Sequence, residues 1–165
     1  MTRATIGRDG LLHLDGLRCR VALGGGGVRA DKQDGDGATP AGLLPLRRVL
    51  YRADRVARPR AAAPIQPLAP ADGWCDDPAS ADYNRLVQRP HPDRHEELWR
   101  GDAVYDIIGV LGWNDDPVVR GRGSAIFLHV ARPGYRPTEG CVALKRADLV
   151  RLLARLGPRT RLAIG

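Results

Sequence analysis

The segment SAIFLHVARPGYRPTEGCVAL, residues 124–144, joins a strand, a turn-rich loop and a second apolar segment in immediate succession. Aliphatic side chains alternate with others up to His129, so this histidine ends the strand predicted for residues 123–130 on the face opposite a purely aliphatic one. Residues 131–140 then contain two prolines and two glycines, which predict a loop. The segment therefore predicts a strand that ends in a histidine and a loop that brings the chain back toward it at Cys141.

Similar short strand patterns recur along the chain, and helical patterns are few. The predicted helices are RADLVRLLARLG (146–157), which has a leucine stripe, and a helix that starts at Asp93, with Glu96 completing a capping box after Pro92. Together these patterns predict a mainly β fold, a sandwich or mixed sheet with a few short helices. The predicted strands are two short ones within residues 12–24 around Asp15-Gly16, LRRVLYR (46–52), AVYDIIGVLGW (103–113), GSAIFLHV (123–130) and RTRLAI (159–164).

The chain of 165 residues is long enough for one domain with a substantial core and short for two. Its glycine-rich stretch (24–42) lacks the spacing of a phosphate-binding loop, and its proline-rich stretch (58–70) does not separate two persuasive cores. Both stretches are therefore interpreted as loops within one domain that spans residues 1–165.

The net charge of +7, carried almost entirely by arginine, favours a polyanionic partner such as nucleic acid or the bacterial cell wall. The arginines are scattered, and no helix-turn-helix or basic-aromatic pattern is present, so we expect no nucleic-acid partner. No apolar run is long enough for a membrane-spanning helix, and the first residues lack the apolar stretch of a secretory signal.

Three cysteines, an odd number without a CxxC pair, leave at least one free thiol. Cys19 lies on the apolar face of a predicted strand, as a structural thiol would, and it could pair with Cys75. His91 and His95 have a metal-like spacing, but Pro92 lies between them and no third ligand is near. We therefore expect no metal site.

Cys141 is open to two interpretations. A free cysteine is only a few per cent thiolate at neutral pH, so catalysis needs a neighbouring group that takes its proton. His129 could serve as this base, because its loop can fold back, and Gly140 permits an unusual backbone conformation beside the thiol. The alternative is that Cys141 is one more small apolar residue that enters the core.

The segment 124–144 resembles the active-site segment of YkuD-type L,D-transpeptidases, in which a strand-end His precedes a variable loop and a Ser/Thr-x-Gly-Cys motif. His129, Thr138, Gly140, Cys141 and the aliphatic residues after it match this pattern. DKQDGDGATPAG (31–42) resembles a stretch near the N-terminal side of the family's domain. A compact subgroup of the family is resembled by four further stretches, GWCDDP (73–78), YNR (83–85), LWRGDAVYD (98–106) and GRGSAIFLH (121–129), and all these stretches together cover most of the chain.

The resemblance implies a two-step acyl transfer on peptidoglycan stem peptides. Cys141, activated by His129, would attack a stem carbonyl and form a thioester, with the backbone N–H groups of Gly140 and Cys141 as oxyanion donors. An amine of meso-diaminopimelate on a second stem would then attack the thioester. No cofactor or metal is implied, and we expect a monomer in the periplasm, where this substrate lies. Candidate substrate-binding residues are Arg122, Ser124, Thr138, Tyr105, Asn84 and Trp74, although Arg122 and Ser124 could instead anchor a turn, and Trp74 and Tyr105 could be core aromatics.

Two positions depart from the family pattern. The usual Arg after Cys-aliphatic is Ala143, whose missing charge Lys145 or Arg122 could replace. The small and hydroxyl residues that usually follow the His are Val130-Ala131, which favours a backbone carbonyl as the group that orients the imidazole. A changed site favours a changed donor, and some compact members of the family attack the first-position L-Ala carbonyl. We therefore expect L-Ala–diaminopimelate links.

Several alternatives share the same residues. The common diaminopimelate–diaminopimelate (3,3) reaction uses the same nucleophile, and so does an L,D-carboxypeptidase or endopeptidase that releases the acyl group to water. An inactive cell-wall-binding module would explain Ala143, and a nucleic-acid-binding module would explain the charge.

Overall fold

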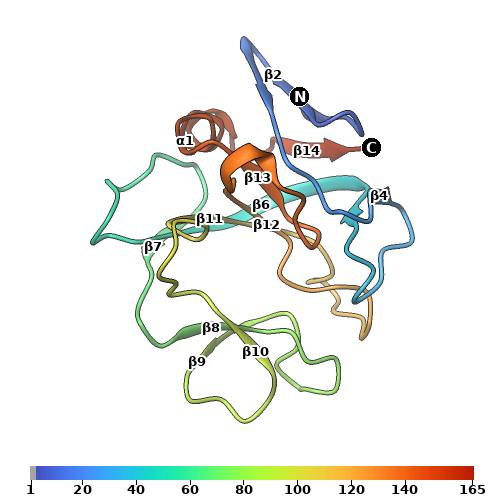
Figure 1. Ribbon diagram of the computed structural model, residues 1–165, viewed down its shortest axis with the longest axis vertical. Helices are drawn as coiled ribbons and strands as arrows, with labels where there is room; N and C mark the ends of the chain where they lie inside the picture. The colour runs from blue at the N-terminus through green and yellow to red at the C-terminus, as the bar shows by residue number, and fades with distance from the viewer. Residues whose placement is uncertain (1–2) are drawn as a thin grey trace.

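The structure, a computed structural model, describes residues 3–165 and is built on one large mixed sheet (Figure 1). Its strand order is β13-β12-β11-β6-β14-β1-β2-β3, and β7 pairs with β6 beside this path. Ala22, just after β3, forms an antiparallel bridge with Ala143 of β13, so the two ends of the sheet meet and almost close a barrel. The strands are β1 (Arg3–Ile6), β2 (Leu11–Leu14), β3 (Leu17–Arg20), β4 (Val28–Arg29), β5 (Thr39–Pro40), β6 (Gly42–Tyr51), β7 (Ile65–Pro67), β8 (Asp72–Cys75), β9 (Leu86–Gln88), β10 (His95–Glu97), β11 (Ile107–Leu111), β12 (Phe127–Val130), β13 (Val142–Leu144) and β14 (Arg161–Ile164).

The first hairpin follows the predicted alternation. Strands β2 and β3 pair antiparallel with Leu14 opposite Leu17, and Gly16 takes a φ of 74° in the turn between them. Leu12, Leu14, Leu17 and Cys19 are buried, whereas the residues between them are exposed. The prediction of two strands around Asp15-Gly16 is confirmed.

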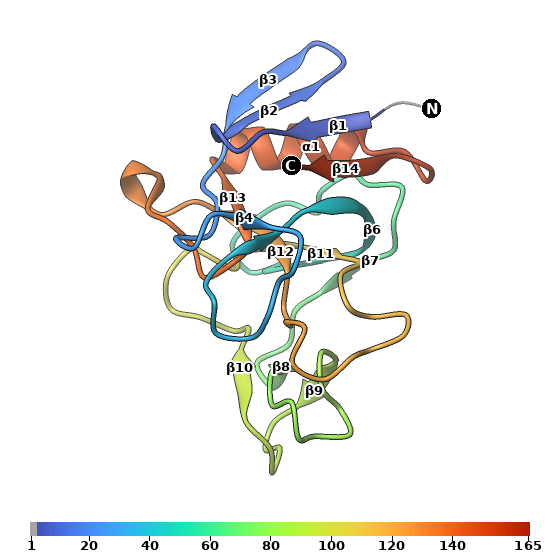
Figure 2. The same ribbon diagram turned by 90° about the vertical axis from the view of Figure 1, so that its right-hand side faces the viewer.

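Helix α1 (Arg146–Arg155) confirms the strongest helical pattern in the sequence. Its leucine stripe is fully buried in the main core, and Figure 2 shows the helix packed behind the strands of the upper part of the sheet. The backbone N–H of Leu156 caps the helix on the carbonyl of Leu152, just before Gly157-Pro158. The chain then enters β14, which confirms the closing strand predicted for residues 159–164.

A second, three-stranded sheet of order β10-β8-β9 lies below the main sheet in Figures 1 and 2, and it corrects one prediction. The helix predicted to start at Asp93 is wrong, because residues 95–97 form β10, in which Glu96 pairs with Trp74. The Asp93 carboxylate accepts a hydrogen bond from the Ser80 hydroxyl at 2.5 Å and caps no helix. Besides α1, the only helical segment within residues 3–165 is the single 3₁₀ turn η1 (Pro133–Tyr135).

The three cysteines are all free thiols, so Cys19 and Cys75 do not pair. Both are buried, Cys19 in the main core and Cys75 at the end of β8. No helix within residues 3–165 combines the length and the apolar character that crossing a membrane requires.

Candidate active site

Cys141 lies in a tight turn that its neighbours fix. The Thr138 hydroxyl donates to the Cys141 carbonyl at 2.6 Å and accepts from the Gly140 N–H at 3.1 Å. Gly140 has a φ of 139°, and a Cβ placed there would lie 2.8 Å from the carbonyl oxygen of Ala38. Only glycine fits this position, which allows the glycine-rich stretch to pack against the turn that carries the thiol.

The thiol of Cys141 is held by backbone groups at the start of β12. It donates to the Ala125 carbonyl at 3.1 Å and accepts from the Phe127 N–H at 3.4 Å. Burial raises the pKa of this thiol to about 12, and the negative charge of Glu96 acts in the same direction. In the absence of substrate, Cys141 is therefore a neutral thiol at physiological pH.

His129 is a buried neutral imidazole on β12. Its Nδ1 lies 3.0 Å from the carbonyl oxygen of Val130, and since a carbonyl can only accept, Nδ1 carries the hydrogen and the Nε2 lone pair stays free. The orienting group is thus a backbone carbonyl, as the sequence favoured. Burial lowers the pKa of His129 to about 4, with a further contribution from Arg132. The ring packs edge-to-face on Tyr105 with centroids 5.5 Å apart.

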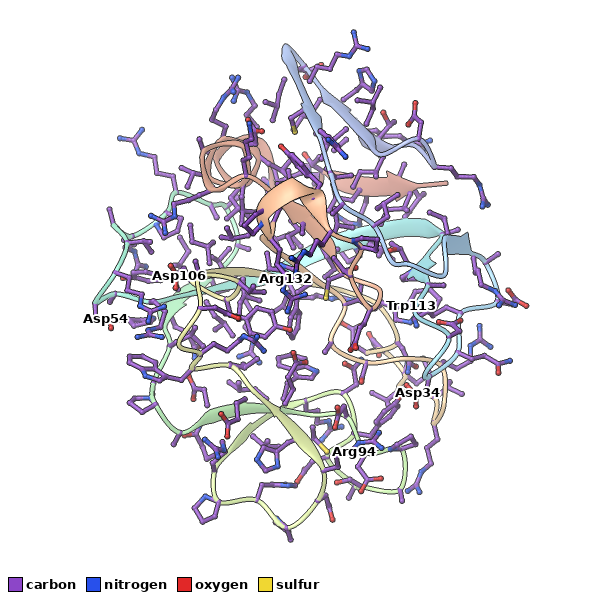
Figure 3. The ribbon with its side chains drawn as sticks, viewed as in Figure 1. Asp34, Asp54, Arg94, Asp106, Trp113 and Arg132 are labelled. Atoms are coloured by element: carbon purple, nitrogen blue, oxygen red, sulfur yellow. The ribbon has the colours of Figure 1, made fainter. Side chains whose placement is uncertain are left out.

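A cavity of about 550 Å³ brings Cys141 and His129 together. Of the predicted substrate-binding residues, Ser124, Thr138 and Tyr105 also line it. Charged groups of both signs complete its wall, and Figure 3 shows Arg132 near the centre of the view, with Arg94 and Asp34 below it. The charged residues of this wall are Lys32, Arg94, Arg100, Arg132, Asp34, Asp76, Glu96 and Glu139.

Asn84 and Trp74 lie outside this cavity and line a second one of about 510 Å³. The Asn84 side chain is buried and makes four hydrogen bonds: its Oδ1 accepts from Trp74 Nε1 at 2.9 Å and from the Ala125 N–H at 3.0 Å, and its Nδ2 donates to the carbonyls of residues 113 and 114 at 2.9 and 2.8 Å. Asn84 thus binds the N–H of Ala125, and the carbonyl of Ala125 accepts the hydrogen bond of the Cys141 thiol. Asn84 therefore fixes the residue that positions this thiol.

Arg122 lines neither cavity. Its side chain is exposed, and its carbonyl accepts from Trp113 Nε1 at 2.8 Å, which anchors the turn before β12. Ala143 is 1% exposed and faces Ala22, so position 143 contributes nothing to the cavity. Lys145 is exposed at the start of α1, away from the cavity lining.

The positive charge around the thiol comes instead from residues that sequence reasoning did not select as site residues. Lys32 is 3% exposed and pairs with Asp36 at 2.6 Å, and its charge lowers the pKa of Cys141. Arg100 pairs with Asp102, and Arg132 follows His129 closely in the chain. Lys32 and Arg100 belong to stretches already matched to the family, 31–42 and 98–106, which is a usable signal, whereas Arg132 gave none.

No group of three or more His, Cys, Asp and Glu side chains in the described part of the chain is arranged to hold a metal ion. The arrangement offers a nucleophile, a base and charged groups around one cavity, which is what acyl transfer between charged peptides requires.

Comparison with known proteins adds one finding. The model of the YkuD L,D-transpeptidase catalytic domain matches residues 4–164, nearly the whole chain. Searches of curated proteins and of solved structures found no match. With a family match of this extent, the chain belongs to the YkuD family of L,D-transpeptidase catalytic domains.

Proposed function

We propose that this protein cross-links peptidoglycan stem peptides through a thioester on Cys141, with His129 as the base. The observation that carries the proposal is that both residues, one from the turn before β13 and one from β12, line the same cavity. Family membership supports stem peptides as the substrate class.

In the first step, the Cys141 thiol leaves the Ala125 carbonyl and gives its proton to Nε2 of His129. The sulfur bonds to the carbonyl carbon of the donor, the C–N bond breaks, and the imidazolium returns the proton to the leaving amine. Both groups are neutral before the donor binds, so the proton moves to the imidazole as the sulfur attacks the carbonyl carbon, and no free thiolate forms beforehand.

The developing oxyanion needs backbone donors. Within residues 3–165 no acceptor is paired with the Cys141 N–H, so this group is free to donate to the oxyanion. The Gly140 N–H already donates to Thr138, and it would have to leave that hydroxyl in order to contribute. We therefore assign the Cys141 N–H as the main oxyanion donor. The Thr138 hydroxyl stabilises the turn through its hydrogen bonds with Gly140 and Cys141.

We propose the first-position L-Ala carbonyl as the point of attack, which gives L-Ala–diaminopimelate links. The support is indirect: Ala143 cannot take the place of the family arginine, so the cavity must recognise the carboxylates of the donor differently. Arg132 suits this role, because it lines the cavity and forms no ion pair with any residue the structure describes. The (3,3) reaction and hydrolysis are the competing outcomes.

The test is incubation with a diaminopimelate-type tetrapeptide muropeptide, followed by intact mass measurement, beside Cys141→Ala. A Cys141-dependent adduct of disaccharide-L-Ala supports the proposal in full. An adduct that retains the tripeptide supports the enzyme and rejects the first-position donor. If neither an adduct nor any product forms, catalysis is rejected in favour of a wall-binding module.

The substrate also leads us to propose a periplasmic location. Fusion of the natural N-terminal region to an export reporter tests it, and strict retention in the cytoplasm would contradict it.

A further inference from the structure

Glu96 faces the same cavity as Cys141, from the opposite sheet. It lies on β10, and the hydroxyl of Tyr105 donates a hydrogen bond to its Oε1. Tyr105 in turn packs edge-to-face on His129. The carboxyl group of Glu96 is therefore held by the same tyrosine that packs on the imidazole, and its charge acts on the Cys141 thiol.

Among the four carboxylates of this cavity only Asp76 forms an ion pair within residues 3–165, and Glu96 is the unpaired one that the Tyr105 hydroxyl holds. Asp76 pairs with Arg94 at 3.2 Å, and both oxygens of Asp34 accept from the Tyr83 hydroxyl, at 2.8 and 2.9 Å. Glu96 forms no ion pair with any residue from 3 to 165, and its Oε2 accepts no hydrogen bond from them. Burial raises the pKa of this carboxyl, and the hydrogen bond from Tyr105 and the more distant charge of Arg100 offset the rise only in part.

A carboxylate that is fixed near a nucleophile and forms no ion pair is suited to binding a positively charged ligand. In the proposed reaction the second substrate is such a ligand, since an aliphatic amine with a pKa of about 10 arrives as an ammonium ion. Building on the proposed function, we propose that Glu96 binds the ammonium group of the acceptor stem and takes its first proton, so that the thioester is delivered to an amine in preference to water.

The step balances as follows. The acceptor ammonium gives one proton to the carboxylate of Glu96, and the neutral amine attacks the thioester carbon. The new C–N bond forms and the C–S bond breaks, while the second proton of the amine passes through His129 to the sulfur. Cys141 regains its neutral thiol, and Glu96 releases its proton to solvent.

The same charge has the opposite effect on the first half-reaction. A negative Glu96 raises the pKa of Cys141 and so disfavours the thiolate that attacks the donor. Removing the charge should ease formation of the acyl-enzyme and impair its transfer to the amine. A residue that only supports the fold would slow both steps, so the two readouts separate the roles.

The experiment uses Glu96→Gln, which keeps the shape and can still accept the Tyr105 hydrogen bond. The full chain is mixed with the tetrapeptide muropeptide, and the rate of the Cys141 adduct is followed by intact mass, together with the ratio of cross-linked to hydrolysed product. We expect the adduct to form at least as fast as in the unmodified protein. The ratio should fall by roughly tenfold or more, the cost of losing a hydrogen bond between charged groups.

Glu139→Gln is the matched control, because Glu139 also lines the cavity and also raises the pKa of Cys141, but is exposed. It should leave the product ratio unchanged. An unchanged ratio in Glu96→Gln, or an equal fall in Glu139→Gln, overturns the inference, as does loss of the adduct in Glu96→Gln. If the unmodified protein forms no adduct, the proposed function itself has failed.

Discussion

The two sheets of the molecule contribute different things to one cavity. The main sheet brings Cys141 and His129 together, and desolvation keeps both of them uncharged. The three-stranded sheet carries charged groups on the opposite wall, with Asp76 just after β8 and Glu96 on β10. The cysteine and histidine thus come from the main sheet, and the smaller sheet adds acidic groups to the opposite wall, while the cation Arg132 also follows β12 of the main sheet.

The largest effect should come from the main sheet. His129→Ala removes the base that accepts the thiol proton, and we expect acylation of Cys141 to slow by about 10²–10⁴-fold. The rate of adduct formation on the muropeptide measures it. Alkylation of Cys141 by iodoacetamide at high pH serves as a control that the thiol remains in place. Acylation at the original rate would mean that another group is the base and would break the assignment of chemistry to the main sheet.

The next effect concerns Asn84, which lies between β8 and β9 of the smaller sheet and binds the backbone of Ala125 beside the thiol. Asn84→Ala leaves the buried donors Trp74 Nε1 and the Ala125 N–H without an acceptor, which should lower the free energy of unfolding by about 3 kcal/mol. Acylation should slow as well, because the Ala125 carbonyl positions the thiol. Denaturant unfolding and adduct formation are the measurements.

Gln88→Ala is the matched control for Asn84→Ala. Gln88 is an exposed amide on β9 whose Nε2 donates to the buried carboxylate of Asp72 at 2.6 Å, so its loss should cost about 1.5 kcal/mol, less than the loss of Asn84, and leave acylation unchanged. Equal losses in the free energy of unfolding for the two variants would mean that the buried hydrogen bonds of Asn84 stabilise the protein no more than those of an exposed amide.

The same division explains what the sequence could predict. Alternation in residues 12–24 and the leucine stripe of α1 are local patterns, and they predicted their elements correctly. The strand end at His129 and the turn at Gly140 lie close in sequence, so their meeting could also be anticipated. The parallel pairing of β12 with β13 is what brings them to one cavity.

The smaller sheet gave no such local signal. Its strand β10 is three residues long and carries no alternation, so the acidic residues at 93 and 96 were interpreted as a helix start. Only pairing with β8 makes Glu96 part of a strand and directs it to the cavity. Lys32, more than 100 residues before Cys141, likewise comes to the cavity through tertiary packing, which spacing along the chain does not encode.

A pH experiment sharpens the claim that the main-sheet residues are uncharged. The pKa of His129 falls from its usual value of 6.5 to about 4 on folding, so between these values the unfolded chain binds the proton more tightly. The contribution of neutral His129 to the free energy of unfolding is fully present above pH 6.5 and is lost as the pH falls toward 4. The loss should be about 3 kcal/mol relative to His129→Gln.

The measurement is the free energy of unfolding of both proteins from pH 7 to pH 4. Asp36 and Asp102, whose pKa values are lowered to about 2, lose their contribution mainly below this window, and they are present in both proteins. Parallel curves for the two proteins would show that His129 takes up its proton as easily in the folded state as in the unfolded one.

The smallest effect concerns Cys19, a second thiol of the main sheet that burial also keeps neutral by raising its pKa. Cys19 packs among apolar side chains of the core, and no hydrogen bond to its sulfur is present in the described part of the chain. Cys19→Ala should cost about 1 kcal/mol of stability, from the lost burial of one sulfur, and leave acylation unchanged. Both thiols are neutral, but Cys141 is partly exposed and lines the cavity, so loss of the adduct in Cys141→Ala alone would tie the acyl group to the thiol at the cavity. Loss of the adduct in Cys19→Ala would mean that the core beneath β3 positions the nucleophile, and the division between the two sheets would then be too simple.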